Sequence, residues 1–342
     1  MIAPCVRVVA EKAEETRARL SLLGVLRQDL RPRRESGYVL LPVREDTRDL
    51  FLGYALHVGD FEEQTRRPGY KELARVPEEL RPLLPTSFDV VGDVLVVKIP
   101  DELLPHAAAV GEALLAAHPS ARVVAHDAGV KDEFRVRDVR VLAGEPRLRT
   151  VHRENGIELE VDLATCYFSP RLAGERARVA ALVREGEAVL DLFAGVGPFA
   201  ILLAKRARPR RVTAVDANPD AVALLAANAR RNKVDDRVVP VLGDAAEVAA
   251  NLAEPADRVL MNLPHSASRF LPAALSACAP EAVLHYHAVL EPPEVDAHVE
   301  ALAAVAAARG WDLAVGGRRV VHSYSPRTRH FSLDFAVRRR KA

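Results

Sequence analysis

The segment from residue 189 to residue 201 constrains the fold of this chain more than any other part of the sequence. An apolar run ends at Asp191, passes through a loop with Gly195 and Gly197, and continues into a second apolar stretch. This order predicts a strand, a tight turn and a helix, the unit that opens a doubly wound α/β domain. Glycines allow a ligand to approach the backbone closely. Because the loop lacks both the Lys-Ser/Thr of a P-loop and the third glycine of a dinucleotide fingerprint, we expect a ligand without phosphates.

Further polar residues stand where the following strands are expected to end. Asp216 closes the apolar run 211–215, 25 residues after Asp191, a position suited to binding ribose hydroxyls. Asp244 follows the run 238–242, and we expect it to contact an adenine amine. A phosphate-free adenosine held by a glycine loop indicates S-adenosylmethionine. The alternative is an ordinary strand–helix turn without a ligand.

Asn262 ends another apolar run and is followed by Leu263, Pro264 and His265. In a doubly wound sheet this strand end lies beside the glycine loop, so an amide side chain and a rigid carbonyl enter the cleft and can bind the edge of a base. Amino methyltransferases carry a related Asn-Pro-Pro-aromatic motif. Since a histidine stands in place of the aromatic residue here, an exocyclic amine is not the expected target. The simpler alternative is a turn after a strand.

The 342 residues are enough for two or three domains, and 49% are hydrophobic and 28% charged, as in a well-packed protein. From about residue 169 onward strands alternate with Ala-rich helices, which predicts a parallel sheet, and two strands at the end predict an antiparallel hairpin. We therefore predict a Rossmann-like α/β domain preceded by two smaller α+β domains. The predicted segments are a small α+β domain over 1–60, a charged, proline-bearing linker over 61–85, a middle α+β domain over 86–165 and the Rossmann-like domain over 166–342.

Net charge, cysteine content and hydropathy restrict the partners and the cellular compartment that we expect for the protein. The net charge is +1, so only local clusters can bind nucleic acid. The three cysteines are far apart and show neither a disulfide framework nor zinc spacing, which indicates a reducing cytoplasm and no metal. There is no signal peptide and no apolar run of membrane-spanning length. We expect a cytoplasmic monomer without membrane contact.

Two other segments suggest function less strongly. In the segment 167–176, Ser169 can cap a helix with Pro170 at its first position, and Arg171 and Glu175 then share one helix face. The plain interpretation is a solvated ion pair, but the helix directly precedes the first predicted cofactor strand. The segment 133–140 alternates cations with apolar residues and could present a basic face to phosphates, although neighbouring acids dilute its charge.

Four motifs in order resemble one family. They are the runs 152–156, 167–176, 191–199 and 262–265, of which Tyr-Phe-Ser-Pro-Arg-Leu-Ala-Gly-Glu-Arg is the most specific. Their order and spacing, and the chain length, resemble the tRNA (guanine-37-N1)-methyltransferases of archaea and eukaryotes, in particular the compact archaeal members. The resemblance implies an N-terminal domain that touches the tRNA elbow, a middle domain and a catalytic domain. It departs at Gly174, where the family usually has threonine.

The resemblance also implies site residues. Glu175 is the implied catalytic base and Arg135 the implied cation near guanine O6, with help from Asn262. Removing the N1 proton and stabilising O6 is what attack on the methyl sulfonium requires. The expected cofactor site comprises Tyr167, Arg176, Asp191, Phe193, Gly195, Gly197, Asp216, Ala217, Asp244, Ala245, Asn262 and Pro264. The expected tRNA site comprises Arg135, Tyr167, Arg171, Asn262 and Pro264.

Two other functions remain open. A paralogous family transfers the aminocarboxypropyl group of the same cofactor in wybutosine synthesis. Its members typically read Phe-Ser-x-Gly-Asn where this chain reads Phe-Ser-Pro-Arg-Leu, which favours methyl transfer here. A non-catalytic S-adenosylmethionine-binding RNA chaperone would not need Glu175, Arg135 and Asn262 together.

Overall fold

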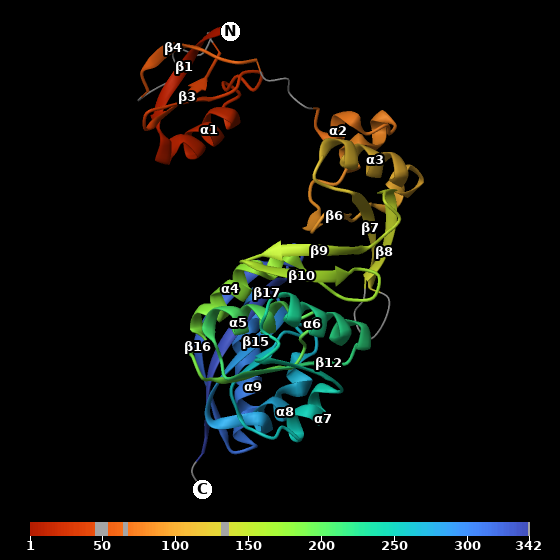
Figure 1. The fold of residues 1–342 in the computed structure, drawn as a ribbon, viewed down its shortest axis with the longest axis vertical. Coiled ribbons are helices and arrows are strands. Elements are labelled where there is room, and N and C mark those ends of the chain that lie inside the picture. Colours follow the sequence, from red (N-terminus) through yellow and green to blue (C-terminus); the bar gives the residue numbers. More distant parts are fainter. Residues whose placement is uncertain (45–53, 64–67, 131–136, 341–342) are drawn as a thin grey trace. The chain divides into compact units, whose positions relative to one another are not determined.

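The computed structural model describes residues 1–44, 54–63, 68–130 and 137–340 (Figure 1). The chain divides into two compact units, Met1–Leu73 and Ala74–Ala342, and each is described here by itself. None of the described helices is both long and apolar enough to cross a membrane.

The first unit is a four-stranded antiparallel sheet with one helix. The strand order is β2-β3-β1-β4, and apolar side chains of β1, β3 and α1 form its core. The segment is α+β, as predicted, and its edge strands β2 and β4 are short and mostly exposed, so they carry little apolar pattern in the sequence. The elements are β1 (Ile2–Val9), α1 (Ala13–Leu22), β2 (Arg33–Glu35), β3 (Tyr38–Pro42) and β4 (Leu56–Asp60).

The segment predicted as a linker, 61–85, is packed at both of its ends. Phe61 is buried in the first unit, and Ala74 and Leu84 are buried in the second. It holds the short helix α2 (Tyr70–Leu73) and a 3-10 helix at Glu78–Leu83. Its apolar residues, spaced between prolines, thus anchor the segment, which the charge and proline content of the sequence did not reveal.

The middle sheet has the order β5-β6-β7-β8, with β6 and β7 parallel and the other pairs antiparallel. A hairpin turn at Gly92-Asp93 joins β5 and β6, and α3 packs on the sheet. The elements are β5 (Asp89–Val91), β6 (Val94–Val97), α3 (Ala107–Ala117), β7 (Val123–Val130) and β8 (Arg137–Gly144).

A separate hairpin of β9 (Arg149–Glu154) and β10 (Ile157–Asp162) packs against the following domain. The Asn228 side chain accepts a hydrogen bond from the Glu160 backbone N–H (2.7 Å) and donates to the Glu160 carbonyl (2.9 Å). Apolar residues of the hairpin share one core with the helices of that domain. The predicted boundary at 165 therefore places this hairpin in the middle domain, although it packs against the C-terminal domain.

The C-terminal domain contains a seven-stranded sheet of order β13-β12-β11-β14-β15-β17-β16. The first five strands in this order are parallel, and β17 and β16 form the predicted antiparallel hairpin. The strands are β11 (Ala188–Asp191), β12 (Arg211–Asp216), β13 (Val238–Leu242), β14 (Ala256–Met261), β15 (Cys278–Leu290), β16 (Trp311–Ser323) and β17 (Arg329–Arg339).

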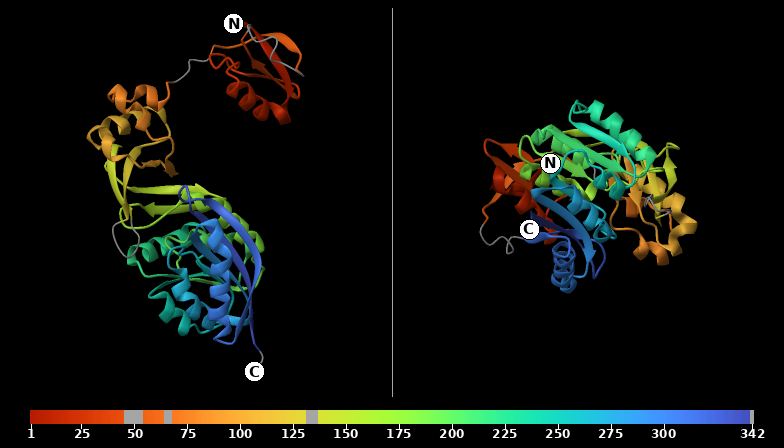
Figure 2. Two further views of the ribbon diagram at one scale, coloured as in Figure 1. Left: turned by 180° about the vertical axis from the view of Figure 1, so that it is seen from behind. Right: turned by 90° about the horizontal axis from the view of Figure 1, so that it is seen from below.

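Helices cover both faces of this sheet, because successive strand residues point to opposite faces and both faces are apolar (Figures 1 and 2). One core joins α4, α5 and α6 to the sheet, and the other joins α7, α8 and α9. The helices are α4 (Ala173–Leu182), α5 (Pro198–Ala207), α6 (Pro219–Arg231), α7 (Ala245–Ala250), α8 (Leu271–Ala277) and α9 (Val295–Ala307). The predicted Rossmann-like fold is confirmed, with β11 and β14 adjacent at the point where the strand order reverses.

Candidate active site

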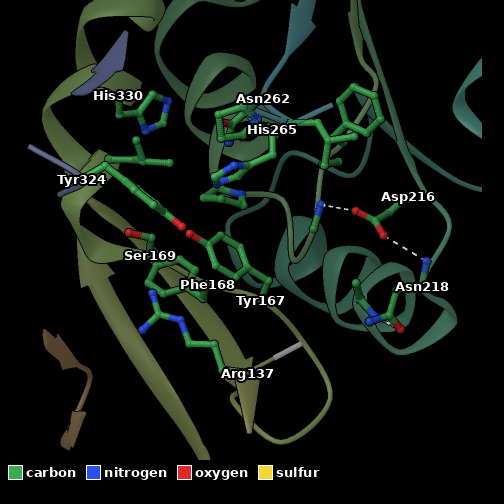
Figure 3. A pocket seen from close by; sticks show the side chains of 18 of the residues that line it. Arg137, Tyr167, Phe168, Ser169, Asp216, Asn218, Asn262, His265, Tyr324 and His330 are labelled. Carbon is green, nitrogen blue, oxygen red and sulfur yellow. Dashed lines mark hydrogen bonds between the residues drawn. The ribbon is translucent and has the colours of Figure 1, made fainter. Parts of the chain in front are cut away.

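A pocket of about 330 Å³ lies at the carboxyl ends of β11, β12 and β14 (Figure 3). This is the crevice where doubly wound sheets bind ligands. Seven predicted residues line it: Tyr167, Arg176, Phe193, Gly195, Asp216, Asn262 and Pro264. The chain thus brings residues from four separate segments to one cavity; the strand-end pattern predicted three of them, and the family resemblance implied the fourth, 167–176.

The two glycines of the loop have different tasks. Both have positive φ, +54° at Gly195 and +92° at Gly197. A Cβ at Gly195 would find no atom closer than 3.8 Å, and Gly195 lines the pocket. A Cβ at Gly197 would lie only 2.2 Å from Cδ1 of Leu225, so this glycine faces the core and allows α5 to pack against α6. Gly197 does not line the pocket.

The Asp216 carboxylate closes β12 and is tied to the glycine loop. It accepts hydrogen bonds from the backbone N–H groups of Gly195 (2.7 Å) and Asn218 (2.9 Å). Burial raises the pKa of Asp216, and these backbone donors offset part of the rise. A carboxylate can accept about four hydrogen bonds, so lone pairs remain for the hydroxyl groups of a ligand.

Two buried polar side chains at the ends of neighbouring strands lack partners. Among the described residues, neither carboxylate oxygen of Asp191 nor Oδ1 of Asn262 has a hydrogen-bond partner. Burial raises the pKa of Asp191 to about 7; the nearby Phe193 backbone N–H offsets part of the rise, and the charge of Asp216 adds to it. Unsatisfied buried acceptors are costly, and since Asn262 lines the pocket, its Oδ1 indicates a missing ligand donor such as an amide group. Asp191, a predicted cofactor residue, is buried and does not line the pocket.

The segment 167–176 forms one wall of the pocket, and ion pairs join it to other strands of the second unit. Arg176 is buried and donates two hydrogen bonds of 2.6 Å to Glu154 on β9. Arg171 donates to Asp89 on β5 (2.7 Å), so the alternative Arg171–Glu175 ion pair is not formed. Arg171 does not line the pocket.

Glu175 lies behind the pocket wall in a buried network. Arg178 donates two hydrogen bonds to it, at 2.6 and 2.9 Å, and also two to Asp334 on β17, at 2.6 and 3.0 Å. Asp334 in turn lies 2.5 Å from Nδ1 of His285. Burial alone would raise the pKa of Asp334, but the bonds from His285 and Arg178 outweigh it and hold the pKa well below its usual value. Glu175 does not line the pocket. Its negative charge nonetheless acts to raise the pKa of His330, against the burial that lowers it.

A group of histidines completes this side of the cavity. His330 lines the pocket, and its Nε2 lies 2.9 Å from Nδ1 of the buried His287. Burial lowers the pKa of both rings to about 3. Both imidazoles are therefore neutral near pH 7, so each ring has one nitrogen that donates and one that accepts.

The remaining predicted residues are placed elsewhere or lie outside the described part of the chain. Asp244 accepts hydrogen bonds from the N–H groups of Ala246 and Glu247, so its carboxylate is engaged as the N-cap of α7 rather than directed at a ligand. Neither Asp244, Ala217 nor the buried Ala245 lines the pocket. Arg135 lies outside the described residues.

Several pocket residues were not predicted. Arg137 lies two residues after Arg135 in the same basic segment, and its guanidinium contacts Asp127 (3.1 Å) and stands 5.4 Å from the Tyr167 ring centre. The strand alternation of 133–140 could have identified it. Lys98, Asn218, His322, Tyr324 and His330 also line the cavity and carried no local signal.

Comparisons with known proteins agree along the whole chain. Residues 150–314 match the TRM5/TYW2 methyltransferase domain, residues 71–147 the TYW2 N-terminal domain and residues 5–51 the tRNA methyltransferase 5 N-terminal domain. The chain is 41% identical to the tRNA (guanine(37)-N(1))-methyltransferase Trm5b of Pyrococcus abyssi, over 97% of this chain and 98% of that one. The crystal structure of Pyrococcus abyssi Trm5b superposes with a TM-score of 0.76 at 40% identity, covering 98% and 99% of the two chains.

A relative with another activity matches less of the chain. The tRNA(Phe) (4-demethylwyosine(37)-C(7)) aminocarboxypropyltransferase of Methanocaldococcus jannaschii is 31% identical over 72% of this chain and 96% of that one. The match to the methyltransferase is thus both closer and longer.

Proposed function

The chain belongs to the tRNA (guanine-37-N1)-methyltransferase family, and we propose that it transfers a methyl group from S-adenosylmethionine to N1 of guanine 37 in tRNA. The observation that carries this proposal is the pocket where Gly195, Asp216 and Asn262 meet at adjoining strand ends. We further propose that it acts as a monomer and in the cytoplasm, and the three free, buried cysteines support the reducing compartment.

The pocket residues fit this cofactor. Asp216 would bind the ribose hydroxyls with its remaining lone pairs, beside the open surface of Gly195. Asp191 does not line the pocket, so its buried carboxylate would act on the positive charge of the cofactor's amino acid end without direct contact. When bound, S-adenosylmethionine supplies an electrophilic methyl group.

The protein must hold guanine in line with that methyl group and manage one proton. The Asn262 amide, whose Oδ1 has no partner among the described residues, is available to the edge of the base. Arg135 is the proposed cation at O6, with Arg137 lining the pocket two residues later. These groups hold the reactants together, which replaces an unfavourable bimolecular encounter.

We propose Glu175 as the base that takes the N1 proton. Because its carboxylate is paired with Arg178 and does not line the pocket, it must leave that pair to reach the base. Arg178 would remain neutralised by its two hydrogen bonds to Asp334, so the release leaves no unpaired buried cation.

The first unit is proposed to bind the tRNA elbow. In the sequence, Arg27, Arg31, Arg33 and Arg34 form a basic cluster in this unit that we expect to contact tRNA. Some of its members are paired in the structure, since Arg31 lies 3.6 Å from Glu62 and Arg33 lies 2.5 Å from Glu35. These pairs are exposed, so they are weak and a phosphate can compete for the arginines.

Nucleoside mass spectrometry of tRNA transcripts tests the proposal. After incubation with the enzyme and S-adenosylmethionine, a transcript with guanine at position 37 should yield 1-methylguanosine, and one with adenine there should not. An aminocarboxypropyl adduct would instead establish the paralogous reaction, and an unmodified transcript would favour a binding protein.

A further inference from the structure

The turn between β16 and β17 carries an aromatic side chain that the proposed chemistry does not use. Tyr324 lines the pocket, yet 53% of its surface is exposed. Figure 3 shows its ring and that of Tyr167 both pointing into the cavity. His265 supports the Tyr324 ring edge-on, with ring centres 5.2 Å apart and planes at 66°. A large exposed ring at the mouth of a pocket is available to a flat ligand.

The turn is ordered by its own hydrogen bonds. Ser325 Oγ accepts from the backbone N–H of Thr328 (3.0 Å), and the N–H of Tyr324 donates to the Thr328 carbonyl (3.1 Å). Arg329 donates to the carbonyls of Ser325 (2.9 Å) and Thr328 (3.0 Å). The backbone that carries Tyr324 is therefore ordered before any ligand binds, which lowers the entropic cost of contact.

The same turn presents a cation to solvent. Arg327 is exposed, and within the described part of the chain its guanidinium has no acidic partner. Arg318, on the same hairpin, is paired with Asp296 at 2.5 Å. An arginine without an acidic partner beside an exposed aromatic ring suits single-stranded nucleic acid, which offers both phosphates and base faces.

We propose that this turn is a contact for the anticodon loop, in which Tyr324 stacks on the extruded target base and Arg327 binds a neighbouring phosphate. This inference rests on the proposed function. A guanine must leave its stack before its N1 can react, and a ring at the mouth of the pocket replaces part of the stacking that is lost. Tyr324 is thus a positioning residue for the base.

The test compares Tyr324→Ala and Tyr324→Phe with the control Val320→Ala. Val320 is 51% exposed on the same hairpin but does not line the pocket. We expect Tyr324→Ala to lower kcat/KM for tRNA about tenfold or more, and Tyr324→Phe to stay within about twofold of wild type. Affinity for S-adenosylmethionine should not change. A tRNA with 2-aminopurine at position 37 should show altered fluorescence when bound to Tyr324→Ala but not when bound to Val320→Ala.

Arg327 provides an independent measurement. Arg327→Ala should reduce the slope of log affinity against log salt concentration by about one, while Arg327→Lys should retain it. If wild type methylates tRNA and Tyr324→Ala and Arg327→Ala behave like Val320→Ala, the turn is not a contact although the proposed function stands. If wild type leaves tRNA unmodified, the proposed function fails, and unchanged 2-aminopurine fluorescence in Tyr324→Ala would also reject stacking. An equal loss in Tyr324→Phe would assign the effect to the hydroxyl group and overturn the stacking role.

Discussion

Replacing each glycine of the cofactor loop by alanine should separate folding from binding. In Gly197→Ala, the left-handed backbone costs about 1–2 kcal/mol for an L-residue. The new methyl would also lie 2.2 Å from Cδ1 of Leu225 and 2.9 Å from Cδ1 of Ile201, and such overpacking costs about 1–3 kcal/mol. The expected loss of unfolding free energy is therefore about 2–5 kcal/mol, reduced to the extent that the Leu225 side chain can move.

Gly195→Ala is the matched control, because it should lose less stability than Gly197→Ala but more affinity for S-adenosylmethionine. Its backbone is also left-handed, but the methyl would meet nothing closer than 3.8 Å, so only about 1–2 kcal/mol of stability should be lost. Because that methyl would enter the pocket wall, affinity for S-adenosylmethionine should fall about tenfold or more, equivalent to at least about 1.4 kcal/mol.

Urea denaturation of the ligand-free enzyme, followed by circular dichroism, measures the first effect, and calorimetric titration with S-adenosylmethionine measures the second. If Gly197→Ala is no less stable than Gly195→Ala, the packing argument is wrong. Leu225→Ala should be less harmful in the Gly197→Ala background than alone, because it removes the clashing methyl group. Purely additive losses would contradict the direct contact.

Three further outcomes are expected. Glu175→Gln should slow single-turnover methylation about 10²–10⁴-fold with cofactor affinity unchanged, and a rate within about threefold of wild type would reject the base role. Asp191 has a folded-state pKa of about 7 against an ordinary 3.8, so the unfolded chain releases this proton first and stability should decline as pH rises from about 4 to about 7. Asp191→Asn should remove that decline in urea unfolding at about pH 5 and pH 8, and an unchanged pH dependence would show that Asp191 is not its source. Deleting residues 1–73 should weaken tRNA binding and flatten its salt dependence while sparing cofactor affinity, so an unaltered salt slope would exclude this unit as an RNA contact.

Much of the site followed from local pattern and one rule of sheet geometry. Apolar runs that end in Asp191, Asp216 and Asn262 identify strand ends, and parallel strands bring such ends to one edge of a sheet. The glycines mark the loop between strand and helix. Together these signals predicted the fold class, the position of the pocket and several of its lining residues, whereas Tyr167 and Arg176 were implied by the family resemblance.

Whether a single residue in that pattern faces the ligand or supports the fold depends on tertiary packing. Gly195 and Gly197 look alike in sequence, but only the contact with Leu225 shows that the second serves the core. Asp244 follows the same strand-end pattern as Asp216, yet its carboxylate caps α7. The sequence could identify the positions but not the direction in which each group faces.

Contacts between remote segments were beyond the sequence altogether. Arg171 pairs with Asp89 rather than with Glu175, which lies on the same helix face in the sequence-based prediction. Arg178 joins Glu175 to Asp334, which is 156 residues away from it, and the β16–β17 turn brings Tyr324 to a pocket built from β11, β12 and β14. Local sequence determines which strands and helices form, because periodicity and caps act over a few residues. Partners across the fold depend on which strands become neighbours, and only the assembled sheet decides that.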